Sequence, residues 1–451
     1  MQITMKKKTI IIILAVLSIS SRAQYVTETV NGASVLPTNG SLLFVRDCPT
    51  TPFSLSYVAE DRTFYAFTKA VYTMGLPYTT FPIKKITLTA DVVEVNDIYA
   101  VDSIAFFCGK DTTGTSFIGS FNVLRVGEIN YPNANDIRVT PITQVSSLNK
   151  IKVFKTGGSY TVYAIGLSFD PNDNLVKNAI VEFPNAQNSS SYRFVRLGFA
   201  LPFYAEVVDD IVFTQRNVVI IERDNYNYPP NGYIAMRKVG KTTGLASTDL
   251  NTLHYYPMNF EYNSKICAAS LGGEDFAIAY AAYTTTTPNP FPVRVRTFNT
   301  QSMSAAHSYE YNTYEKIDMH GLIYNSGSAI LTVLHQKSPT STFVYINPTA
   351  TSNYSARSLY DAATEYTSLD AISANQFIAT SSKKWFMQEN TSVSIKSCLM
   401  QDWYPVSLIF QIFPHNTTTT NILSTPYPTT PYYRLPTISN VNSQADCHKT
   451  Q

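Results

Sequence analysis

The chain has 451 residues, and 44% of them are hydrophobic, which is enough to bury a large core and excludes a small scaffold held together by disulfides. Only 15% of the residues are charged, and 34 Lys and Arg nearly balance 32 Asp and Glu. This composition excludes a coiled coil and a charge-rich disordered chain. It also argues against nucleic-acid binding, which needs a basic excess to displace counterions.

Residues 1–23 have the pattern of a secretory signal peptide. Residues 6–8 are all lysine, residues 10–17 form an unbroken apolar run, and small residues lead to Ala23. The run is shorter than the roughly 20 apolar residues of a spanning helix, although an N-terminal membrane anchor is the alternative. We expect cleavage after Ala23, a secreted, periplasmic or cell-surface location, and no transmembrane segment in the mature chain.

Most of the mature chain consists of short stretches with a strand pattern. Apolar residues alternate with polar ones or form short runs bounded by turn residues, as in residues 102–109, 115–123 and 160–169. These stretches are rich in Val, Ile, Tyr, Phe and Thr, which suit a pleated, half-buried surface. Because stretches with helical periodicity are few, the sequence predicts an all-β protein.

The strand-like stretches also recur in groups with a period of about 55 residues. The leading strand of each group ends at Val95, Val145, Val207, Phe260, Ile317 and Leu369. Turn-rich units of this kind are typical of propeller blades. We therefore expect residues 42–397 to form a β-propeller of about seven four-stranded blades. Six or eight blades, or an array of two-sheet sandwiches, are the alternatives.

One unit carries a resemblance to known sequences. Residues 96–123 read NDIYAVDSIAFFCGKDTTGTSFIGSFNV and resemble a blade of uncharacterised secreted β-propeller proteins of Bacteroidota bacteria. The resemblance extends over about residues 40–397 at the level of pattern. It implies a propeller fold and an exported bacterial protein, but it carries no catalytic residue to this chain.

The two ends of the mature chain differ from the repeats. Residues 24–41 form an N-terminal lead-in, and residues 398–451 form a tail rich in Pro and Thr without apolar periodicity. Proline favours extended backbone and removes hydrogen-bond donors, so we expect this tail to be irregular. Cys398 and Cys447 flank the tail and are candidates for a disulfide, for which Cys48 is a competing partner.

Asp170, Asn172 and Asn174 form a candidate metal site. Oxygen ligands at alternate positions suit calcium, the one cofactor for which the sequence offers any sign. However, Leu175 occupies the place where a calcium loop needs glycine. A hairpin turn explains the same residues, because Asp and Asn are common in turns.

Acidic residues recur near the ends of the leading strands, which line the central channel of a propeller. Two carboxylates about 5–9 Å apart at the channel mouth would suit glycoside hydrolysis. The alternative is that these residues cap tight turns between strands. The candidates are Asp97, Asp102, Asp209, Asp318 and Asp370, with Asp210 beside Asp209.

The loop at residues 225–233 is aromatic, and its Tyr226, Tyr228 and Tyr233 are candidate binding residues. Exposed tyrosines stack on sugar rings or anchor protein partners, although they also pack across sheet edges. The common hydrolase, zinc-protease and nucleotide-binding motifs do not occur. We therefore expect a monomeric, non-catalytic binding or scaffold propeller that recognises a glycan or a protein through its face loops. A propeller glycosidase or lyase is the alternative.

Overall fold

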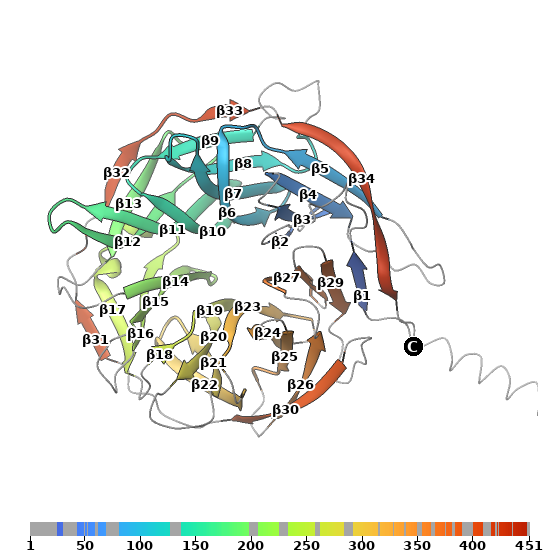
Figure 1. Cartoon of the computed structure of the whole chain (residues 1–451). Helices are drawn as coiled ribbons and strands as arrows, with labels where there is room; N and C mark the ends of the chain where they lie inside the picture. The colour runs from blue at the N-terminus through green and yellow to red at the C-terminus, as the bar shows by residue number, and fades with distance from the viewer. Residues whose placement is uncertain are drawn as a thin grey trace, which may run out of the picture.

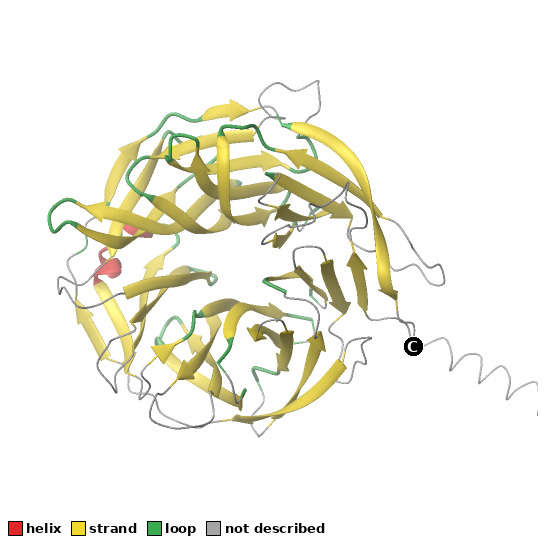
Figure 2. Ribbon diagram, in the orientation of Figure 1, coloured by secondary structure: helices red, strands yellow, loops and turns green. Residues whose placement is uncertain are grey.

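The computed structural model of the chain consists almost entirely of β-strands. It describes residues 25–29, 43–48, 50–51, 53–58, 62–68, 81–126, 137–197, 206–224, 233–257, 262–283, 292–313, 316–327, 329–337, 340–349, 354–361, 366–374, 376–380, 384–389, 400–408, 416–419, 422, 424–434 and 436–448. Helical structure within these residues is confined to two short turns, η1 (Gly244–Ala246) and η2 (Thr248–Asn251). Figure 2 shows the strands gathered into sheets around a central axis.

The first four sheets each contain four consecutive antiparallel strands. The first is β2 (Leu43–Asp47), β3 (Phe53–Val58), β4 (Thr63–Thr68) and β5 (Phe81–Thr87). The second is β6 (Val92–Val101), β7 (Ile104–Asp111), β8 (Ser116–Asn122) and β9 (Ile137–Ile142). The third is β10 (Ser147–Thr156), β11 (Ser159–Asp170), β12 (Leu175–Phe183) and β13 (Ser191–Leu197). The fourth is β14 (Glu206–Phe213), β15 (Asn217–Asp224), β16 (Tyr233–Gly240) and β17 (Thr252–Pro257).

Two more sheets of this kind follow, and a sheet of different origin completes the ring. The fifth is β19 (Cys267–Gly272), β20 (Asp275–Tyr283), β21 (Pro292–Asn299) and β22 (Ser304–Asn312), with the short β18 (Tyr262–Asn263) also on β20. The sixth is β23 (Asp318–Asn325), β24 (Ile330–Lys337), β25 (Thr340–Ile346) and β26 (Tyr354–Asp361). The closing sheet has β27 (Ser368–Ser373), β28 (Gln376–Thr380) and β29 (Lys384–Glu389), and it gains β1 (Tyr25–Thr29) from the start of the chain.

This arrangement confirms the expected all-β propeller, and Figure 1 shows the sheets placed around the axis like blades. The expected seven four-stranded blades do not hold as stated. Six described sheets are runs of four consecutive strands, whereas the closing sheet has three such strands and borrows β1. The outer edges of the sheets also carry strands that the repeat did not predict.

Those additional strands come from the C-terminal segment, so the expectation of an irregular tail is wrong for its described residues. β30 (Met400–Leu408) pairs with β26 and β22, and β31 (Asn416–Thr419) pairs with β17. β32 (Thr425–Pro428) pairs with β13, and β33 (Tyr432–Arg434) pairs with β9. β34 (Thr437–His448) pairs first with β5 and then with β1. Figure 1 shows these orange and red strands on the outside of the ring.

The tail can form strands because a strand at the outer edge of a sheet needs backbone hydrogen bonds on one side only. In β32, Pro426 and Pro428 alternate with Thr425 and Tyr427, opposite β13. Proline is tolerated on an edge strand, where a missing N–H on the outer side breaks no ladder bond. The tail therefore runs back around the ring, opposite to the order of the blades.

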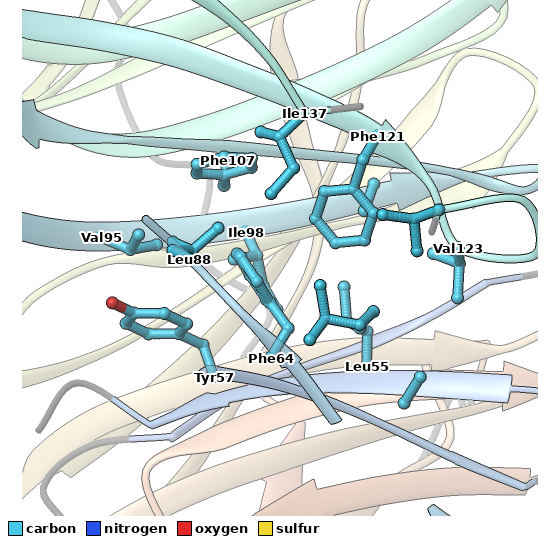
Figure 3. Close-up of a cluster of buried hydrophobic side chains, with 14 of the residues drawn as sticks. Leu55, Tyr57, Phe64, Leu88, Val95, Ile98, Phe107, Phe121, Val123 and Ile137 are labelled. Carbon is cyan, nitrogen blue, oxygen red and sulfur yellow. The ribbon is translucent and has the colours of Figure 1, made fainter. Parts of the chain in front are cut away.

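The hydrophobic core lies between neighbouring sheets. In the cluster drawn in Figure 3, Leu55 and Phe64 of the first sheet meet Phe107 and Phe121 of the second. The ring centroid of Phe64 lies 5.2 Å from that of Phe107 and 5.1 Å from that of Phe121, in edge-on contacts. Because such clusters recur between sheets, the sheets are fixed face to face and their innermost strands surround the axis.

Candidate functional site

A pocket of about 300 Å³ lies on the axis of the ring. Residues of β2, β6, β10, β14, β19, β23 and β27, which head their sheets, line it. Its charged lining residues are Arg46, Asp97, Lys150, Lys152, Asp210, Lys265 and Asp370. All seven inner strands therefore contribute to one polar site, which we call the axial pocket.

Bulges in the inner strands shape this pocket. The pairing of β6 with β7 skips Asn96, and that of β10 with β11 skips Asn149. The pairing of β14 with β15 skips Asp209, and that of β23 with β24 skips His320. A bulge turns the strand locally and re-aims the side chains beside it, here Asp97, Lys150 and Asp210 among others. The repeated bulge is therefore part of how the sequence builds the axial pocket.

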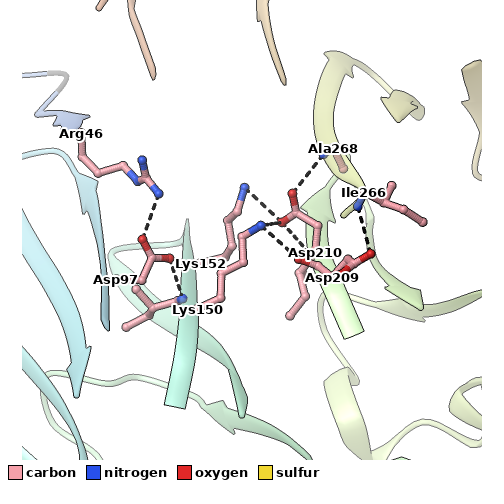
Figure 4. A network of polar contacts seen from close by, with 10 residues as sticks. Arg46, Asp97, Lys150, Lys152, Asp209, Asp210, Ile266 and Ala268 are labelled. Atoms are coloured by element: carbon pink, nitrogen blue, oxygen red, sulfur yellow. Dashed lines mark hydrogen bonds and ion pairs between the residues drawn. The ribbon is translucent and has the colours of Figure 1, made fainter. Parts of the chain in front are cut away.

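Asp97 is only 2% exposed and connects three sheets. One carboxylate oxygen accepts from the Arg46 guanidinium of the first sheet at 3.0 Å. The other accepts from the backbone N–H of Ile151 in the third sheet at 3.0 Å. Burial acts to lower the pKa of Arg46, but Asp97 and Asp370 outweigh it and raise that pKa. Asp97 therefore ties three sheets together through its two oxygens (Figure 4).

Asp209 and Asp210 tie the fourth sheet to the fifth. The Asp209 carboxylate accepts hydrogen bonds from Nε of Arg223 at 2.7 Å and from the N–H of Ile266 at 2.9 Å. The Asp210 carboxylate pairs with Nζ of Lys150 at 2.9 Å and accepts from the N–H of Ala268 at 3.0 Å, as Figure 4 shows.

Asp210 also faces Lys152, whose Nζ lies 3.5 Å from its Oδ1. Burial alone would raise the pKa of Asp210, but the two lysines and the Ala268 N–H lower it to about 2. A general acid of a glycosidase needs the opposite, a carboxyl group with a raised pKa. The geometry at Asp210 suits a permanent anion that holds two lysines.

The structure separates the remaining carboxylates that the sequence singled out. Asp370 lines the axial pocket, and its Oδ1 accepts from the N–H of Ala371 at 3.0 Å. Asp102 has a left-handed φ of 51° in the turn before β7 and binds Lys155 at 2.7 Å. Asp318 begins β23, is exposed and does not line the axial pocket. Asp97 and Asp370 thus both line the axial pocket, whereas Asp102 and Asp318 do not.

The basic side of the axial pocket was missed from the sequence. Lys150 and Lys152 lie two positions apart on β10 and therefore share one face. A signal was present, because Val95-Asn96-Asp97, Leu148-Asn149-Lys150 and Val208-Asp209-Asp210 each place two polar residues after an apolar one. These triplets coincide with the bulges, so a comparison of the leading strands would have found both charge types.

The aromatic loop is described only at its end. Tyr226 and Tyr228 lie outside the described residues, and Tyr233 begins β16. The ring of Tyr233 is half-buried and lies 5.8 Å from the ring of Tyr255 in an edge-on contact. The ring of Tyr233 therefore packs against another tyrosine of its own sheet, and packing of this kind was the alternative to ligand binding.

The candidate calcium residues form a hairpin turn between β11 and β12. Asp170 accepts from the Asn172 N–H at 3.1 Å and from Lys177 at 2.8 Å, and Asn174 has a left-handed φ of 59°. The ammonium group of Lys177 is thus already paired with the carboxylate that a calcium ion would need as a ligand. Across the described ranges, no three His, Cys, Asp or Glu side chains are placed to hold a metal ion.

The proposed disulfide stays a prediction. Cys398 lies outside the described residues, and Cys447 is in β34 opposite Thr27 of β1. Cys48, the competing partner, is buried. In the described part of the chain, no helix has the length and apolar character needed to cross a membrane.

Comparison with known proteins gives matches among solved structures alone. No protein-family model and no curated protein matches the chain. The β-propeller domain of Cps50 (Swd1) from Myceliophteria thermophila is 7% identical with a TM-score of 0.37, and the match covers 80% of this chain and 99% of that domain. The WD40 domain of SCAP from fission yeast is 8% identical with a TM-score of 0.34, covering 82% and 99%.

Proposed function

We propose that the protein is an exported binding propeller that holds a glycan or a protein partner without transforming it. The observation that carries this proposal is the bonding of the axial carboxylates. Asp97 and Asp210 each bind a cationic side chain and a backbone N–H of another sheet. Carboxylates held in this way serve the architecture of the ring rather than proton transfer.

A rigid frame around a polar pocket is suited to binding. The axial pocket collects side chains from every inner strand, and the sheets that carry them are fixed by their packed cores. Frames of this kind commonly present binding residues at their ends and loops. The aromatic loop at residues 225–233 stays a second predicted contact on the sequence pattern alone.

Export is proposed on the sequence of residues 1–23. Their lysines, apolar run and small residues support recognition as a signal peptide and cleavage after Ala23. The resemblance of residues 96–123 to secreted propellers of Bacteroidota supports the same location. N-terminal sequencing of the exported protein should begin at Gln24, and a start at Met1 would contradict cleavage.

The test of binding is an array of glycans and purified surface proteins, probed with the mature protein, followed by recovery of the bound ligand. We expect saturable binding and an unchanged ligand mass. A ligand that is cleaved by the protein, but not by a folded Asp210→Asn variant, would replace this proposal with the glycosidase or lyase alternative.

A further inference from the structure

The axial pocket has two electrically different sides. On one side, Arg46 pairs with Asp97 at 3.0 Å, and Asp370 also attracts its guanidinium. On the other side, Lys150 and Lys152 share Asp210, and Lys265 lines the same pocket. The second side therefore has three lysines facing one lining carboxylate, which leaves an excess of positive charge.

The three lysines differ in how closely acidic and carbonyl oxygens hold their ammonium groups. Lys150 is fixed, because it donates to Asp210 at 2.9 Å and to the carbonyl oxygen of Asp209 at 3.1 Å. Lys152 is held more loosely, 3.5 Å from Asp210. Lys265 is exposed, and no acidic partner for it is found among the described residues. Lys152 and Lys265 are thus the cations available to an anionic group, in a recess where charges attract more strongly than in bulk water.

The rest of the lining is suited to a sugar. Tyr99 offers a ring, with the Nζ of Lys152 5.8 Å from its centroid, and Asn149 and Ser368 add neutral hydrogen-bonding groups. Aromatic rings stack on sugar faces, and amides and hydroxyls bind sugar hydroxyls. A volume of about 300 Å³ is at the small end of ligand pockets and suits one sugar unit.

We propose that the axial pocket binds a sugar that carries a carboxylate, a uronic acid, with Lys152 and Lys265 holding the carboxylate. This inference rests on the proposed binding function and names the ligand class of its site. Its test is calorimetric titration of the mature protein with glucuronate, with glucose as the neutral counterpart and acetate as the isolated anion.

The variants Lys152→Met and Lys265→Met should each weaken glucuronate binding by about tenfold, the usual worth of a charge-assisted bond. Lys155→Met is the matched control, because Lys155 lies on the same strand and is exposed but does not line the axial pocket. It should leave the affinity unchanged. Acetate should bind more weakly than glucuronate, and glucose should show no measurable binding.

Equal binding of glucose and glucuronate, an absence of glucuronate binding, or unchanged affinity in both lysine variants would overturn this inference. The proposed function fails separately. If the array finds a partner whose binding the lysine variants leave intact, the binding function stands and the uronic-acid site is wrong. If the mature protein binds nothing on the array and no glucuronate, both proposals fail.

A second inference is carried by the C-terminal segment. The first and last described strands, β1 and β34, meet at the junction between the first sheet and the closing sheet. β1 pairs with β29 on one side and with β34 on the other. β34 first pairs with β5 at seven positions, from Thr437 to Ser443, and then crosses to β1 (Figure 1).

The other described strands of the segment pair with one sheet or with two sheets that follow one another in the chain. β30 pairs with β26 at seven positions and with β22 at two, β33 pairs with β9 at three, and β31 and β32 pair with their edges at four positions each. Side chains add to them, as the ring of Tyr427 stacks on that of Tyr192 at 5.8 Å. Among the described strands of this segment, β34 alone bridges two sheets that are not neighbours in the chain, so we expect it to have the largest influence on closure of the ring.

We infer that strands β30 to β34 act as a strap whose last strand, β34, locks the ring closed. Hydrogen exchange of the full-length mature protein tests this. Val441→Pro removes a backbone N–H from β34, opposite Ile83 of β5. We expect exchange to rise at least about tenfold in β1 and β5, which corresponds to the loss of one or two backbone bonds.

Tyr433→Pro in β33 is the matched control and should raise exchange in β9 but not in β1. Val441→Gly provides a milder change if the proline variant does not fold, and the same pattern is expected with smaller amplitude. Unchanged exchange in β1 in the folded β34 variants would overturn the proposed lock.

Discussion

Arg46 and Asp97 form an ion pair of 3.0 Å between the first and second sheets, and their side chains are 15% and 3% exposed. The second oxygen of Asp97 accepts from the Ile151 N–H, so one carboxylate joins three sheets. Asp210 repeats the pattern between the third, fourth and fifth sheets.

Replacing Arg46 by Met should destabilise the protein strongly. The substitution leaves Asp97 buried without its cation, and removal of one partner from a buried pair costs about 3–5 kcal/mol. Urea unfolding should show a loss near the lower figure, because Arg46 keeps 15% of its side chain exposed. Lys155→Met, which removes the exposed partner of Asp102, should leave the midpoint almost unchanged.

The stability of the protein should fall steeply in acid through Asp210. Its folded-state pKa is about 2, below the ordinary value of 3.8, so its ion pairs stabilise the fold above the unfolded-state pKa. That contribution, about 2 kcal/mol, should be lost as pH falls from about 4 to 2. Unfolding free energies of wild type and Asp210→Asn should therefore differ at pH 6 and converge near pH 2. A constant difference across this range would contradict the assignment, and Asp318→Asn serves as an exposed control.

A substitution at Gly166, which faces the bulge in β10 but does not line the axial pocket, should still disturb that pocket. A Cβ on Gly166 would lie 1.9 Å from the carbonyl oxygen of Ser147, at the start of β10. Gly166→Ala should therefore displace β10 and cost about 1–3 kcal/mol. Gly240→Ala is the comparison, because its Cβ would meet the movable Thr243 hydroxyl at 3.2 Å. Thermal unfolding that ranks the two variants equally would refute the role given to Gly166.

The turn interpretation of residues 170–174 makes a prediction about calcium. Lys177 already binds Asp170 at 2.8 Å, so addition of calcium or of a chelator should leave the melting temperature of the protein unchanged. The melting temperature of the Lys177→Met variant should not respond to calcium either, because Asn172 and Asn174 are exposed turn residues. A calcium-dependent rise in melting temperature that is lost in Asp170→Asn would restore the metal site.

Local patterns in the sequence were sufficient to predict an all-β propeller, but not the number of strands in each blade or the strand pairing of the tail. Short alternating strands follow from side chains that must face a core on one side. The strap did not follow, because nothing within residues 425–428 indicates that β13 lies beside them. Pairing between segments so far apart depends on the finished ring, and a Pro-rich stretch reads as irregular until its edge position is known.

The candidate site was likewise predicted from the sequence only in part. Of the recurring acidic residues, Asp97 and Asp370 line the axial pocket, whereas Asp102 and Asp318 do not. Their partners did not follow, because Arg46 and Ile151 belong to other sheets and the bulges decide which side chains face them. A carboxylate with a cation beside it and a carboxylate poised for catalysis have the same sequence signature.

The most direct test of a binding function combines calorimetric titration of the mature protein against its best array ligand with mass spectrometry of the ligand after prolonged incubation. We expect saturable binding, loss of affinity in Lys152→Met and Lys265→Met, and recovery of the ligand intact. Cleavage of the ligand by wild type, abolished in a folded Asp97→Asn or Asp210→Asn variant, would contradict it.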